Sequence, residues 1–72
     1  MTDKQQEMIE YTTQDIIAFI MEDESRSMDG AMDLFYSSKT FERLTDVETG
    51  LYLQGSAYVY EMFKMEQNQR SR

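Results

Sequence analysis

Residues 9–20 read IEYTTQDIIAFI, and the spacing of their apolar side chains is typical of one face of an α-helix. That face, with Met8 at its margin, is formed by Ile9, Thr12, Thr13, Ile16, Phe19 and Ile20. Upstream, Thr2 and Gln5 have the spacing of a capping box, and the acidic cluster 22–24 favours a helix end near Glu24. The sequence therefore predicts a long amphipathic first helix.

A second long helix is predicted from Thr45 onward. Thr45 and Glu48 have capping-box spacing, and Asp46 adds a negative charge to the first turn. The predicted buried face of this helix consists of Leu51, Tyr52, Gly55, Ser56, Val59, Met62 and Phe63. Because Gly55 and Ser56 leave a shallow notch in that face, we expect the first helix to cross there closely; the competing interpretation is a kink.

Two shorter helical segments are predicted between the long ones. Ser27 is a suitable N-cap for a helix that continues to about Ser37. Phe41 and Leu44 lie three residues apart on a further turn of helix, with Ser38 or Thr40 as the candidate cap. The chain has no proline and three glycines, which favours helices over a turn-rich sheet.

The composition allows one small domain. Leu, Ile, Val and Phe make up 14 of the 72 residues and the net charge is -7, so the composition borders on that of disordered chains. Most of these residues nevertheless fall on the predicted helix faces. We therefore expect an all-α fold, a small three- to four-helix bundle whose long first and last helices pack together. It covers residues 1–72 as one domain, with frayed ends at 1–5 and 67–72.

The missing residue types exclude several chemistries. Without cysteine or histidine, the chain has no thiol, no imidazole base and none of the common zinc ligand sets. The acidic segment 22–30 can be compared with a calcium-binding loop in two registers. If the loop begins at Asp23, both the glycine at position 6 and the glutamate at position 12 are missing; if Gly30 is placed at position 6, the glutamate is still missing. We therefore expect no enzyme activity, no metal and no cofactor, and interpret the carboxylates as solvated surface groups.

The sequence also predicts where the protein acts. The longest apolar run, residues 16–21, is far shorter than the roughly 20 residues of a membrane span, and residues 1–15 do not resemble a signal peptide. We expect a cytoplasmic protein that contacts no membrane. With 14 acidic and 7 basic residues it should not bind nucleic acid directly, and so small a bundle leaves little room for a small-molecule substrate.

Several apolar side chains lie outside the two predicted buried faces. They are Ile17, Met21, Leu53, Tyr58, Tyr60 and Met65. Either the short helices wrap around to cover these side chains or a second chain does. The six residues are therefore candidates for a partner-binding surface. The main functional hypothesis is a protein-interaction module without catalysis, which forms a homodimer or binds another protein.

Two segments carry a pattern that can be compared with known proteins: SSKTFERL at 37–44 and ETGLYLQGSAYVYE at 48–61. The pattern resembles a group of short bacterial helical proteins of unknown function, over residues 16–66 of this chain. More distantly, the chain is similar to small antitoxin-like helical proteins, although it has Leu51-Tyr52 where those relatives often carry Leu-His. The distant resemblance implies an alternative function as an antitoxin.

Charge supports a related alternative. Residues 61–72 carry a net charge of +1, so the first sixty residues carry -8. A chain this acidic can act as the partner of a basic protein, for example by imitating the charge of a nucleic acid. The antitoxin-like or nucleic-acid-mimicking role is kept as the alternative to self-association.

Overall fold

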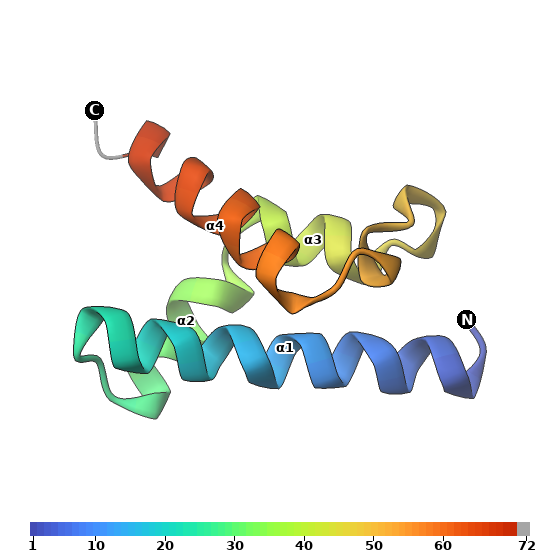
Figure 1. Ribbon diagram of the computed structural model, residues 1–72, viewed down its shortest axis with the longest axis horizontal. Coiled ribbons are helices and arrows are strands. Elements are labelled where there is room, and N and C mark those ends of the chain that lie inside the picture. Colours follow the sequence, from blue (N-terminus) through green and yellow to red (C-terminus); the bar gives the residue numbers. More distant parts are fainter. Residues whose placement is uncertain (71–72) are drawn as a thin grey trace.

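The computed structural model describes residues 1–70, and this part of the chain is helical without any strand. The α-helices are α1 (Asp3–Glu24), α2 (Met28–Tyr36), α3 (Lys39–Thr45) and α4 (Ser56–Arg70); two 3-10 turns, η1 (Val47–Thr49) and η2 (Leu51–Leu53), connect α3 to α4. In Figure 1, α1 spans the length of the molecule, with α3 and α4 above it. The predicted small all-α bundle is confirmed, and α1 packs against α4 as expected.

The first helix forms where its apolar spacing predicts it. Thr2 and Gln5 make the reciprocal bonds of a capping box, and Ser25 ends the helix in a left-handed conformation with φ of 53°. The buried positions of α1 are Ile9, Thr12, Thr13, Ile16, Ile17 and Ile20. Phe19, predicted on this face, is only half-buried, whereas Ile17, predicted outside it, is buried in the core.

The core is centred on two phenylalanines. Phe35 of α2 and Phe63 of α4 are fully buried, and their rings meet edge to face with centroids 5.5 Å apart. Phe41 of α3 meets Phe35 in the same way at 5.4 Å. Such pairs contribute about 1 kcal/mol each beyond the burial of their surface. Helices as short as α2 and α3 are not stable alone, so these contacts hold them in the fold.

The segment before α4 differs from the predicted helix. Residues 47–53 form η1 and η2, and the predicted capping box at Thr45 is wrong: the Asp46 side chain instead accepts a hydrogen bond from the Glu48 N–H. Gly55 has φ of 88°, in the left-handed region, so α4 begins only at Ser56. A β-carbon at Gly55 would have no atom within 4 Å, so Gly55 is not a point of close helix crossing. The first helix does pass beside Ser56, whose hydroxyl bonds to Asp15, and the chain changes direction at Gly55, which is closer to the competing interpretation of a kink.

Gly55→Ala is expected to lower the free energy of unfolding by about 1 kcal/mol, because alanine pays a steric cost in the left-handed region even where space is open. Urea unfolding followed by circular dichroism measures the loss. Gly55→Asn is the matched control, since asparagine tolerates this conformation better and should lose less. Equal stability of Gly55→Ala and the native chain would contradict the assigned backbone conformation.

Polar contacts attach η2 and α4 to α1. Ser56 donates a hydrogen bond of 2.5 Å to the Asp15 carboxylate, and Gln5 donates one of 2.9 Å to the Tyr52 hydroxyl. One turn further along α4, the Tyr60 hydroxyl donates a 2.6 Å hydrogen bond to Asp23. From this line of contact α4 rises obliquely away from α1 (Figure 1). Its C-terminal half therefore packs against α3.

The two ends of the described chain are helical. α1 begins at Asp3 and α4 continues to Arg70, so most of the segments predicted to fray are built into helices; whether they open in solution stays a prediction. Residues 71–72 of the second segment lie outside the described residues. Among the helices of residues 1–70, none combines the length and the apolar character needed to cross a membrane.

Candidate protein-interaction surface

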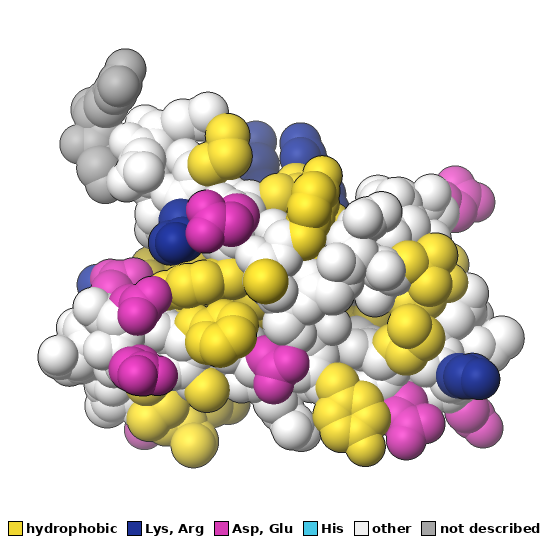
Figure 2. Space-filling model, viewed as in Figure 1, with side chains coloured by type: hydrophobic (Ala, Val, Ile, Leu, Met, Phe, Trp, Pro, Cys, Tyr) yellow, Lys and Arg dark blue, Asp and Glu magenta, His cyan; other side chains and the backbone are white. Residues whose placement is uncertain are grey.

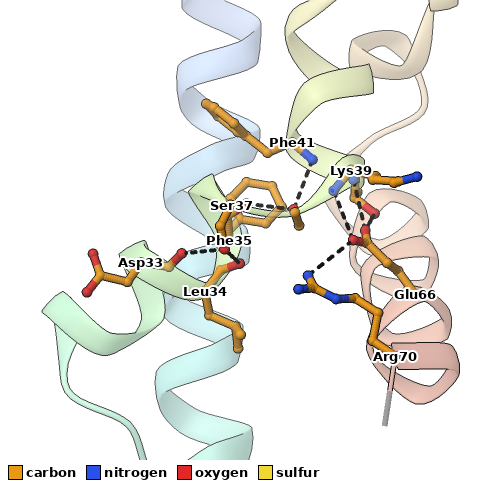
Figure 3. Close-up of polar contacts among 10 residues, drawn as sticks. Asp33, Leu34, Phe35, Ser37, Lys39, Phe41, Glu66 and Arg70 are labelled. Carbon is orange, nitrogen blue, oxygen red and sulfur yellow. Dashed lines mark hydrogen bonds and ion pairs between the residues drawn. The ribbon is translucent and has the colours of Figure 1, made fainter. Parts of the chain in front are cut away.

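Glu66 of α4 reaches across to the first residues of α3 (Figure 3). Its carboxylate accepts hydrogen bonds from the backbone N–H groups of Lys39 and Thr40, both at 2.9 Å, and from the Thr40 hydroxyl at 2.7 Å. Arg70, one turn further along α4, lies 3.8 Å from the same carboxylate. A negative charge here satisfies free amides at the start of α3 and thereby fixes α3 beside α4.

The pKa of the Glu66 carboxyl lies below its ordinary value of 4.5. Burial acts to raise this pKa, since the side chain is only 14% exposed. The hydrogen bonds from Lys39 and Thr40, together with the Arg70 charge, lower it by more. The group is therefore ionised at neutral pH, as its three donors require.

A cleft of about 220 Å³ lies between α3 and α4. We call it the α3–α4 cleft; it is lined by Lys39, Thr40, Arg43, Met62, Met65, Glu66 and Gln69. A neighbouring depression of about 360 Å³ shares Arg43 and Met62 with it and adds Leu51 and Tyr58. The two hollows form one continuous surface along the outer side of α4.

The apolar part of this surface is a stripe on α4. Tyr58, Met62 and Met65 follow one another at i, i+4 and i+7, so they share one helix face, and Tyr58 and Met65 are exposed. Leu53 of η2, nearby in the chain, is also exposed. Methionine side chains adapt to the shape of a partner, and exposed apolar patches of this kind mark contact sites.

The charged part of the surface is a pair of cations on α3. Lys39 and Arg43 are exposed at i and i+4, and within residues 1–70 neither has an ion pair. Figure 2 shows dark blue basic side chains emerging behind the hydrophobic side chains of α4. The only carboxylate lining the cleft within the described chain is that of Glu66, which α3 already engages. The free charge at the cleft is therefore positive, although the chain is acidic.

The six residues predicted to bind a partner divide into two groups. Ile17 and Tyr60 are buried, and Met21 is half-buried against the core. These three side chains are therefore covered by the same chain and need no second one. Leu53, Tyr58 and Met65 are exposed. Tyr58 and Met65 line the candidate surface, whereas Leu53 lines neither of its two hollows.

Sequence reasoning missed other parts of the same surface. It assigned Met62 to the buried face, whereas Met62 is half-buried and lines the cleft. It gave Lys39 and Arg43 no role, although their spacing of four residues on a predicted helical turn was a readable signal. What the sequence does not reveal is that α3 lies beside α4, which depends on the contacts of Glu66.

Tyr60 joins α4 to α1 through its ring and its hydroxyl. Its ring lies 5.1 Å from that of Phe19, and the Lys64 ammonium sits 5.0 Å from its centroid. Burial, the hydrogen bond to Asp23 and the surrounding negative charges raise the pKa of its hydroxyl above the ordinary value. The hydroxyl therefore stays protonated at neutral pH and acts as a donor between α4 and α1.

Among residues 1–70, no three acidic side chains gather in an arrangement that could hold a metal ion. Comparison of the chain with family models, curated proteins and solved structures gives no match. The surface along α3 and α4 must therefore be interpreted from its own geometry and chemistry.

Proposed function

We propose that this protein is an interaction module that associates with a second copy of itself through the surface along α3 and α4. The observation that carries the proposal is the apolar stripe of exposed Tyr58 and Met65 with half-buried Met62, beside the α3–α4 cleft. A domain with so small a core is only marginally stable, and burying these side chains against a second copy would stabilise its folded state. Tyr58 and Met65 are two of the six residues that the sequence predicts to lie outside the buried helix faces.

Met65→Asp is expected to weaken self-association by about tenfold or more, because it places a charge on the apolar stripe. Sedimentation equilibrium over a range of concentrations measures the change. Met28→Asp on α2 is the matched control, since Met28 is 58% exposed and Met65 is 60% exposed, but Met28 lies outside the cleft. Association that is equally strong in both variants would place the contact elsewhere.

The alternative is an acidic protein that binds a basic partner, either as an antitoxin or in imitation of a nucleic acid. It is favoured by α1, which contains seven acidic residues and one lysine. A native chain that sediments with the mass of a single copy at all concentrations would reject self-association and leave this alternative.

A further inference from the structure

We infer that the second copy occupies the α3–α4 cleft with the outer face of its α1, so that the contact joins two different surfaces of the same protein. The inference rests on the proposed self-association and specifies which surfaces meet. It is carried by the opposite charges and the matching apolar content of the cleft and of α1.

The outer face of α1 is acidic and exposed. Glu7, Tyr11 and Gln14 lie on the side of the helix opposite its buried residues, and Glu10 lies at the edge of that side, next to the position of Ile17. All four are exposed. Within residues 1–70, the carboxylates of Glu7 and Glu10 make no ion pair. The Tyr11 ring, one turn after Glu7, adds a large exposed apolar group to the same side. We call these four residues the acidic face of α1.

The α3–α4 cleft offers the complementary chemistry. Lys39 and Arg43 are free cations one helical turn apart, and Met62 and Met65 form the apolar wall beside them. Glu7 and Glu10 are three residues apart, so their carboxylates also lie about one turn apart. If the Tyr11 ring of α1 packs on the two methionines, Glu7 and Glu10 can lie against the two cations of the cleft. Binding of a helix in a groove in this way is a common mode of recognition.

A symmetric contact between two clefts fits less well. It would bring Lys39 and Arg43 of both copies together, and like charges facing each other oppose binding. The cleft's own carboxylate, Glu66, is held by the start of α3 and cannot neutralise them. The acidic face of α1 supplies the missing negative charge.

The two surfaces lie on opposite sides of the molecule. α1 forms one side and α3 and α4 form the other (Figure 1). The residues of the acidic face of α1 are exposed to solvent. A copy that inserts its α1 into a neighbour's cleft therefore keeps its own cleft open. Contacts between two different surfaces of this kind continue into rings or chains rather than stopping at a closed pair. Mass should grow beyond two copies as concentration rises.

The decisive variant is Glu7→Lys/Glu10→Lys. Each substitution changes the charge by +2, so the net charge moves from -7 to -3. The general repulsion between two copies is then weaker, which by itself would favour association. We expect instead a loss of about tenfold or more in affinity, measured by sedimentation equilibrium at low salt. Asp33→Lys/Glu48→Lys makes the same change in net charge at exposed positions outside both surfaces and should associate at least as well as the native chain.

Mixing provides a second, independent readout. Lys39→Glu/Arg43→Glu alone should not associate, because its cleft and its α1 are then both acidic; an equal mixture with Glu7→Lys/Glu10→Lys should associate again, since opposite charges then meet in both contacts. Circular dichroism verifies that each variant is folded. If the native chain associates and Glu7→Lys/Glu10→Lys associates equally well, the inference is overturned while self-association stands. If the native chain stays a single copy, both fail.

Discussion

Val59→Asp is expected to unfold the protein. Val59 is fully buried in α4, one turn before Phe63 in the core. An unpaired carboxylate at such a position costs roughly 3–5 kcal/mol, in addition to the lost packing of the valine. A single core in a domain of this size supplies a net stability of about the same 3–5 kcal/mol. The substitution therefore removes most or all of the stability, and the circular dichroism signal of the helices should be lost at room temperature.

Two controls on the same helix separate burial from general effects. Tyr58→Asp introduces the same charge at the neighbouring exposed position and should leave the chain folded. Lys64→Ala removes an exposed ion pair with Glu61 and a contact with the Tyr60 ring, and should cost a few tenths of a kcal/mol. A native-like melting curve for Val59→Asp would show that the buried face of α4 has been assigned wrongly.

The parts of the fold that follow from local sequence were predictable. The apolar period of residues 9–20 places α1, and the side-chain caps Thr2, Ser27 and Ser38 place the starts of α1, α2 and α3. Each of these signals acts within about four residues, and each hydroxyl accepts the backbone N–H that the pattern requires.

The connection before α4 shows where such reasoning fails. Residues 45–55 contain a capping-box pattern and an apolar period, so propensity favours one continuous helix. Gly50 and Gly55 instead both adopt positive φ, at 68° and 88°, and the chain turns twice. Glycine permits either conformation, and the choice is made by distant contacts: Tyr52 with Gln5, and Ser56 with Asp15. Contacts across some 40 residues leave no local pattern.

The candidate surface was predictable to the same limited degree. The helical periodicity correctly places Tyr58 and Met65 outside the buried face of α4, because the positions on a helix face depend only on that helix. It cannot show that Ile17 joins the core or that the Tyr60 hydroxyl bonds to Asp23, since both depend on how α1 and its neighbours pack. Nor can periodicity place Lys39 and Arg43 beside Met65, because that arrangement depends on the hydrogen bonds between Glu66 of α4 and the start of α3.

Glu66→Ala is expected to lower the free energy of unfolding by about 2 kcal/mol at neutral pH. The substitution leaves the N–H groups of Lys39 and Thr40, and the Thr40 hydroxyl, without their acceptor, and Thr40 is buried. Urea unfolding measures the loss. Glu61→Ala is the matched control on the same helix, because Glu61 pairs only with exposed Lys64 and should cost a few tenths of a kcal/mol.

The pH dependence separates the charge of Glu66 from its packing. Because folding lowers the pKa of this carboxyl, its contribution to stability is complete above the ordinary value of 4.5. As the pH falls below 4.5, the unfolded chain takes up the proton first, and the contribution is lost by the time the pH has passed through the lowered pKa of the folded state. Glu66→Gln keeps the shape and has no such proton, so its stability should fall less steeply below pH 4.5. Equal slopes for Glu66→Gln and the native chain would mean that the charge of Glu66 does not hold α3 against α4.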